Sequence, residues 1–205
     1  MGVAAVFLIY SSWGKRSGAF MNPAMIVSFL RLGRVKPIDA FGCVACQFIG
    51  GTLGVILPAL VLGSWVMHPS VNYVVTVPGS SGLAAARMGE FIISLGMIFM
   101  MISVNKVPRL APWTGYFAGL LLVLYITYEA PYSGMSLNPA RTFRSAIVAN
   151  LWTGWWIYLT APVLGMLGGV ELHRLLTHEH QRLCGKLNHS GKVACFIRCN
   201  SLHQS

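Results

Sequence analysis

Long apolar stretches separated by short polar segments dominate the chain. Four of them, at residues 38–63, 88–105, 113–128 and 151–172, approach or exceed the roughly 20 residues that a helix needs to cross a hydrocarbon core. A weaker stretch opens the chain and ends at about Trp13. The pattern predicts an all-α integral membrane protein with four full transmembrane helices and a shorter helix at the start.

A phrase of eight residues occurs twice, at residues 17–24 and again 116 positions later at residues 133–140. The copies read Ser-Gly-Ala-Phe-Met-Asn-Pro-Ala and Ser-Gly-Met-Ser-Leu-Asn-Pro-Ala. Each predicts a turn followed by a helix, with Asn22 or Asn138 as the N-cap and a proline in the first turn. Helices of about ten residues are too short to cross a bilayer, and turns at membrane depth must be buried in protein or line a polar cavity. We therefore expect two re-entrant half-helices in duplicated halves.

The repeat also predicts how the chain is divided. The first half covers residues 1–63, an exposed connector covers residues 64–86, the second half covers residues 87–175, and a Cys/His-rich basic tail covers residues 176–205. The second half has room for two helices before Asn138, whereas only 21 residues precede Asn22. We therefore expect the sequence to lack an N-terminal helix and the beginning of the next one.

Composition and charge agree with a membrane protein. Hydrophobic residues make up 55% of the chain and charged residues 10%, which is too apolar for an ordinary soluble domain. The net charge of +10 would also suit nucleic acid. However, if the four stretches cross the membrane and both half-helices are re-entrant, all but Arg87, Arg141 and Arg144 of the fifteen Lys and Arg residues fall on one side. The positive-inside rule makes that side cytoplasmic and places the C-terminal tail there, so the expected partner is the lipid bilayer and not nucleic acid.

The two Asn-Pro-Ala motifs, in equivalent halves of a polytopic chain, resemble the aquaporin or major intrinsic protein family, of bacterial type. The motif residues are Pro23 and Ala24 in the first copy and Pro139 and Ala140 in the second. The resemblance covers residues 2 to about 175. It implies an inverted repeat whose half-helices enter from opposite faces and meet at their N-termini, a homotetramer with one pore per subunit, a location in the cell (inner) membrane, and no cofactor.

The resemblance also assigns roles to residues along the pore. The side-chain amides of Asn22 and Asn138 would donate to a passing oxygen, and the facing helix N-termini would repel cations, including hydronium. Arg141 matches the arginine of the outer constriction. Three further positions are expected along the pore: Met135, Ile126 and Phe20.

Glu90 matches the family's glutamate that braces the second re-entrant turn by accepting backbone hydrogen bonds. The alternative is a carboxylate at the membrane interface that pairs with Arg87.

These residues predict passive permeation of water and possibly of small neutral solutes, without enzymatic activity. Thr142, Ala146 and Tyr158 resemble the water-selective branch of the family, whereas Leu159 and Arg144 depart from its usual residues. A glycerol facilitator and a non-conducting membrane fragment stay open as alternatives.

The cysteines offer two weaker hypotheses. Cys43 and Cys46 would be needed by a thiol-redox membrane enzyme, but nothing near them in the sequence supplies a base or a cation. Four tail residues are weak zinc ligand candidates: Cys184, His189, Cys195 and Cys199. Their spacing matches no strong zinc-finger pattern, so a basic tail with reduced thiols is the preferred interpretation.

Overall fold

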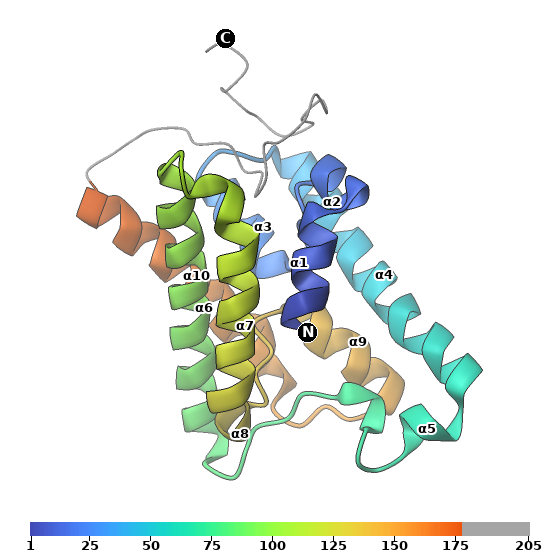
Figure 1. Ribbon diagram of the computed structural model, residues 1–205. Helices are drawn as coiled ribbons and strands as arrows, with labels where there is room; N and C mark the ends of the chain where they lie inside the picture. Colours follow the sequence, from blue (N-terminus) through green and yellow to red (C-terminus); the bar gives the residue numbers. More distant parts are fainter. Residues whose placement is uncertain (178–205) are drawn as a thin grey trace.

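The computed structural model describes residues 1–177, and within that range the fold is entirely helical (Figure 1). In chain order the elements are α1 (Gly2–Tyr10), α2 (Ser12–Ser17), α3 (Pro23–Arg31), α4 (Pro37–Leu62), α5 (Ser64–Met67), η1 (Asn72–Val74), α6 (Gly82–Lys106), η2 (Ala111–Trp113), α7 (Thr114–Tyr128), α8 (Ala130–Ser133), α9 (Pro139–Ala149) and α10 (Trp155–Thr177).

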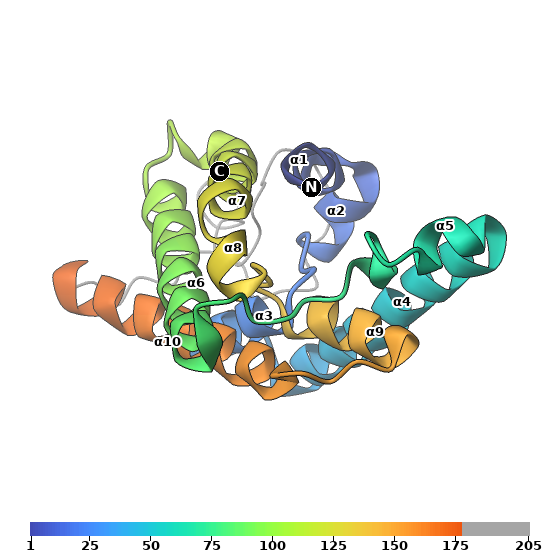
Figure 2. The ribbon, with the colours of Figure 1, turned by 90° about the horizontal axis from the view of Figure 1, so that it is seen from below.

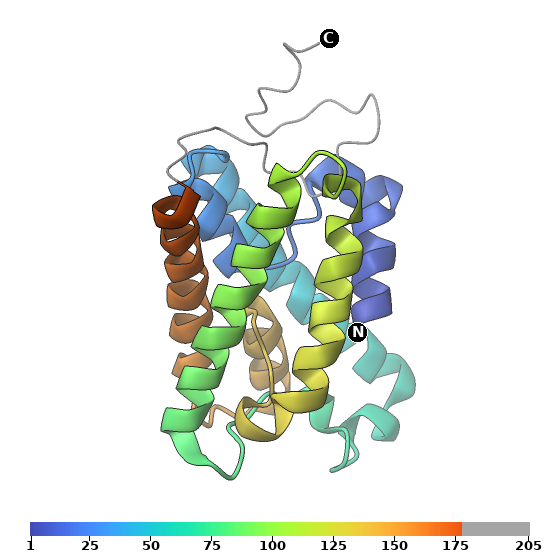
Figure 3. The same ribbon diagram turned by 60° about the vertical axis from the view of Figure 1, so that its left-hand side comes forward.

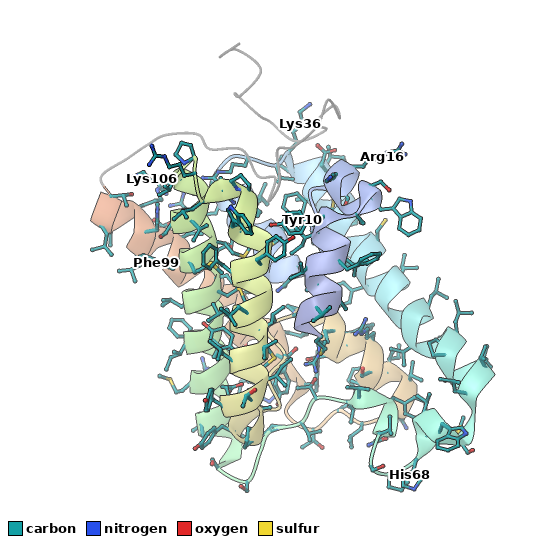
Figure 4. All side chains as sticks on the ribbon, in the orientation of Figure 1. Tyr10, Arg16, Lys36, His68, Phe99 and Lys106 are labelled. Atoms are coloured by element: carbon teal, nitrogen blue, oxygen red, sulfur yellow. The ribbon has the colours of Figure 1, made fainter. Side chains whose placement is uncertain are left out.

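Among residues 1–177, four helical segments are long and apolar enough to cross a membrane: α4, α6, η2 with α7, and α10. They coincide with the four long apolar stretches of the sequence, and the all-α transmembrane architecture is confirmed. The chain is therefore a multi-pass integral membrane protein. Figure 4 places Arg16, Lys36 and Lys106 at one end of the bundle and His68 at the other.

The first apolar stretch does not continue as one helix to Trp13. It breaks at Ser11, whose extended backbone separates α1 from α2. The Ser11 hydroxyl accepts a hydrogen bond from the Gly14 amide at 3.0 Å and so starts a new helix.

The segment between the two halves is partly helical. It contains α5 and η1, and α6 already begins at Gly82, five residues before the expected start at Arg87. Residues 83–86 read Leu-Ala-Ala-Ala, which are strong helix formers, so the helix extends back to the glycine. Thr76 in the same segment is buried, which places part of this connector against the bundle.

The two short helices α3 and α9 contact each other near the middle of the bundle. Figure 1 shows them running from the centre toward opposite ends, and each packs against both α4 and α10 (Figure 2). Each begins with the proline of its Asn-Pro-Ala motif, and the preceding asparagine is the N-cap.

The long helices differ in how much of their surface is buried against the rest of the chain. α10 lies along α6, as Figure 3 shows, and its glycines allow the close approach. A Cβ atom on Gly165 would lie 2.3 Å from the Phe91 carbonyl oxygen. On α4, by contrast, a Cβ on Gly50 or Gly54 would meet no atom within 4 Å. In the most apolar window of each helix, 44% of α10 is buried but only 6% of α4, so α4 presents an apolar surface outward.

Candidate functional site

The two motif asparagines bind each other's turns reciprocally. Asn22 Nδ2 donates to the Leu137 carbonyl at 2.8 Å, and Asn138 Nδ2 donates to the Met21 carbonyl at 2.7 Å. Each acceptor is the residue immediately before the other asparagine. Two hydrogen bonds related by the internal repeat therefore hold the starts of α3 and α9 together.

Each asparagine also caps its own helix. Asn22 Oδ1 accepts from the Ala24 amide at 2.9 Å, and Asn138 Oδ1 accepts from the amides of Ala140 and Arg141 at 3.0 and 3.3 Å. A side-chain amide has two N–H groups, so the one used between the turns leaves a second donor on each asparagine. Because Oδ1 is held by the helix and one N–H by the opposite turn, both amide planes are fixed.

The backbone of both turns is strained. Ala19 in the first turn and Met135 at the corresponding place in the second have φ angles of +56° and +47°. The second turn adds Leu137 at +59°. Non-glycine residues in this left-handed region cost of the order of 1–3 kcal/mol each, so surrounding contacts must hold them there.

Glu90 supplies those contacts for the second turn. Its side chain is fully buried, and it accepts hydrogen bonds from the Ser136 amide, the Leu137 amide at 2.8 Å and the Ser133 hydroxyl at 3.0 Å. It makes no ion pair with Arg87, whose guanidinium lies 5.9 Å from the Trp156 ring centroid. In the first turn, Gln47 of α4 donates to the Phe20 carbonyl at 2.8 Å.

Arg141 lies in the first turn of α9 and is fixed by neutral oxygens. Its Nη1 donates to the Met135 carbonyl at 2.6 Å and to the Thr76 hydroxyl at 3.1 Å. The first bond ties the guanidinium to the second turn, and the second ties it to the connector between the halves.

A cavity of about 620 Å³ surrounds the two asparagines, and we refer to it as the central cavity. It is lined by residues of both turns and of seven helices: α1, α3, α4, α6, α7, α9 and α10. The sequence-predicted residues found in its wall are Asn22, Asn138, Arg141, Ile126, Met135, Phe20 and Ala140. The structure therefore brings together side chains that the sequence places more than 100 positions apart. Phe20 also packs on Phe29, with ring centroids 5.3 Å apart.

The roles of several residues in or around the central cavity were not predicted from the sequence. Thr76 and Gln47 hold Arg141 and the first turn, and Tyr158 donates to the Ser133 carbonyl beneath the second turn. Thr76 stands in a connector with no motif, so nothing in the sequence marks it. Gln47 is a polar residue inside an apolar helix, and that contrast is a usable signal.

The cysteine hypotheses gain no support from geometry. Cys43 and Cys46 are free thiols on α4, and Cys46 lines the cavity. Within residues 1–177 there is no group of three or more His, Cys, Asp or Glu side chains that could hold a metal ion. The four tail candidates, Cys184, His189, Cys195 and Cys199, lie outside the described residues.

The chemistry available in the central cavity is that of hydrogen-bond donation inside an apolar wall. Amide and guanidinium N–H groups gather where two helix N-termini meet, and both helix ends carry partial positive charge. The carboxylates of the described chain lie elsewhere: Asp39, Glu90, Glu129 and Glu171 are all absent from the wall. Such a cavity suits small solutes that bring oxygen acceptors, and it disfavours cations.

Known proteins resemble this chain in sequence and in fold. The sequence profile of the family described as Major intrinsic protein matches residues 1–173. Aquaporin NIP3-1 of Zea mays is 33% identical over 172 residues, covering 83% of this chain and 55% of its own length. Aquaporin NIP1-1 of Arabidopsis thaliana is 31% identical over 208 residues, covering 98% of this chain and 68% of its own length.

Among solved structures, the aquaglyceroporin from Plasmodium falciparum superimposes with a TM-score of 0.77 at 18% identity, covering 86% of this chain and 80% of that one. At this identity the likeness shows the fold alone. The chain spans 55% of the length of the maize relative, so the comparison of sequences concerns about half of that protein. With the profile match over residues 1–173 and the fold agreeing, the chain belongs to the major intrinsic protein family, the family of the aquaporins.

Proposed function

We propose that the protein is a channel for the passive permeation of water, and of small neutral solutes, that excludes protons and other ions. The observation that carries the proposal is the reciprocal pair formed by Asn22 and Asn138 inside the central cavity. Names of relatives that include the word aquaporin agree with it.

The asparagine pair supplies a mechanism for passing water without passing protons. A water oxygen that accepts the free N–H of both amides uses its two lone pairs and turns both hydrogens outward. It then has no lone pair left to accept a proton from a neighbouring water. The positive ends of α3 and α9 add an electrostatic barrier against hydronium and metal cations at the same point.

Arg141 is the proposed selectivity residue on the path. Its bonds to Met135 and Thr76 hold the guanidinium at the cavity wall, where it can donate to solute oxygens and repel cations. Ile126 and Met135 give this part of the wall an apolar surface. Solutes that combine oxygen acceptors with a small apolar body would fit such a wall.

A glycerol or small-solute facilitator is the second candidate, because Ile126 and Met135 offer carbon–hydrogen groups an apolar contact. Thr142 and Ala146 count against it, since both resemble the water-selective branch. Uptake of glycerol and urea by the same vesicles, measured as reswelling by light scattering, would separate the two functions. Glycerol uptake that exceeds water permeation relative to empty vesicles would favour the facilitator.

The decisive experiment is stopped-flow shrinkage of proteoliposomes that contain the full 205-residue chain. We expect water permeability several-fold above that of empty liposomes, with no added proton flux reported by an enclosed pH-sensitive dye. Rates equal to those of empty liposomes would overturn the proposal and favour a non-conducting membrane fragment.

A pair of matched variants tests the asparagine mechanism. Asn138→Asp keeps an oxygen for the helix cap but removes the amide donor, so we expect lost water permeation or lost cation exclusion. Asn150→Asp is the control, because Asn150 is exposed at the C-cap of α9 and uses only its oxygen, as acceptor for Trp152. If the two variants behave alike, the asparagine pair is not the filter.

A further inference from the structure

Arg144 is a second guanidinium in the wall of the central cavity. It follows Arg141 by three residues on α9, so both side chains lie on adjacent turns of one helix face. Its aliphatic stem packs over Gly51 of α4, where a Cβ atom on the glycine would lie 3.2 Å from the Arg144 Cδ. The contact fixes the stem between two helices and leaves the charged end at the cavity.

Within residues 1–177 the structure gives Arg144 neither a hydrogen bond nor an ion pair, and its Nε is buried without an acceptor. The described carboxylates do not reach it, because none of them lines the cavity. A buried N–H without an acceptor has lost the hydrogen bond that water would give it, so an anion that enters and accepts from Arg144 is bound favourably.

Arg141 adds a second positive charge close to that of Arg144. Both hydrogen bonds of its guanidinium come from Nη1 and go to neutral oxygens, so no carboxylate is bonded to it in the cavity wall, and the charge of Glu90 acts on it only through space. The two guanidinium groups are close enough to repel each other. The N-terminus of α9, which opens beside them, contributes further partial positive charge.

We propose that Arg141 and Arg144 form a binding site for a small inorganic anion, and that an anion held there slows permeation through the central cavity. Guanidinium groups bind planar oxyanions with two parallel N–H donors, so nitrate is a suitable probe. The block of permeation rests on the proposed channel function, whereas binding of the anion does not.

Binding is tested first, on detergent-solubilised full-length protein, by the melting temperature in nitrate compared with gluconate at equal ionic strength. A ligand that binds only the folded state raises the melting temperature as its concentration rises. We expect nitrate to raise it for the unmodified chain, to raise it less for Arg144→Lys, which keeps the charge without the two parallel donors, and to leave it unchanged for Arg144→Met. Methionine keeps an apolar stem over Gly51 and removes the charge.

Arg87→Gln is the matched control. Arg87 carries the only other positive charge predicted for this side of the membrane, but it is exposed and packs on Trp156 outside the cavity. This variant should respond to nitrate as the unmodified chain does. The proposed binding site would be refuted if nitrate shifted the melting temperatures of Arg144→Met and the unmodified chain equally. It would also be refuted if nitrate shifted neither.

Permeation is tested second, by stopped-flow water permeability of proteoliposomes with nitrate replacing gluconate on both sides. We expect nitrate to lower the channel-mediated rate by about twofold or more at concentrations that saturate the shift in melting temperature. In Arg144→Met the ratio of the rates in the two salts should return to one. Proteoliposomes that do not conduct water in gluconate would refute the channel function, while the melting experiment would still decide the anion site.

Discussion

At the scale of single residues, Glu90 holds the second turn in its strained conformation. It is fully buried and accepts hydrogen bonds from the amides of Ser136 and Leu137, in a turn where two non-glycine residues have left-handed backbone. A carboxylate accepts all of these bonds at once, whereas an amide offers one oxygen and brings two donors of its own.

We therefore predict that Glu90→Gln lowers the free energy of unfolding by about 2–4 kcal/mol, because at least one buried N–H loses its acceptor. Thermal melts in detergent would measure it. Glu171→Gln is the control, since its ion pair with Arg31 is 2.8 Å long but about half exposed, and such pairs contribute only about 0–1 kcal/mol. A larger loss for Glu171→Gln than for Glu90→Gln would contradict this assignment of the brace.

At the scale of helices, the contrast between α10 and α4 predicts opposite effects of one substitution. Gly165→Ala would place a methyl group 2.3 Å from the Phe91 carbonyl oxygen, so α10 and α6 must move apart. We expect a loss of about 1–3 kcal/mol in the free energy of unfolding. Gly54→Ala meets no atom within 4 Å and should be neutral or stabilising, because alanine favours the helix. Melting temperatures of the two variants measure the difference, and equal losses would show that α4 is packed as closely as α10.

The end of α7 carries a carboxylate that titrates near neutral pH. Burial, with the nearby charge of Glu90, raises the pKa of Glu129 from 4.5 to about 7, and this residue directly follows the span. The folded protein therefore holds a proton that the unfolded chain has already lost, so stability falls as the pH rises from about 4.5 through about 7.

We expect the melting temperature to follow that fall, and Glu129→Gln to flatten it over the same range because glutamine does not titrate. A fall that persists unchanged in Glu129→Gln would assign the pH dependence to another group.

At the scale of the whole molecule, the outward surface of α4 predicts assembly. Only 6% of its apolar window is buried within the chain, and large side chains such as Leu60 and Val61 are more than three-quarters exposed. Lipid can cover such a surface, but we predict that other copies of the chain cover part of it, in the homotetramer that the sequence resemblance implied. Light scattering of the detergent-solubilised protein, corrected for detergent, should give about four times 22.3 kDa. A protein mass near 22.3 kDa would contradict the prediction.

Much of this architecture follows from the sequence alone, because it depends on local or periodic properties. Apolar length predicts the four membrane-crossing segments, and the Asn-Pro pair predicts where α3 and α9 begin, since cap and first-turn proline act within a few residues. The break at Ser11 and the early start of α6 at Gly82 were missed. In both cases a cap or a run of helix formers outweighed the hydrophobic pattern.

What only the tertiary structure decides is which distant groups meet. The bonds of Asn22 to Leu137, Asn138 to Met21 and Arg141 to Thr76 join residues 65 to 117 positions apart, so the packing of whole helices sets their distances. The same packing presses Arg144 against Gly51 and leaves its Nε without an acceptor. The sequence determines that two capped half-helices exist in a membrane protein, because caps and hydropathy are local. The tertiary structure decides that they meet at a cavity with an uncompensated positive charge, because contact and burial arise only when the helices pack.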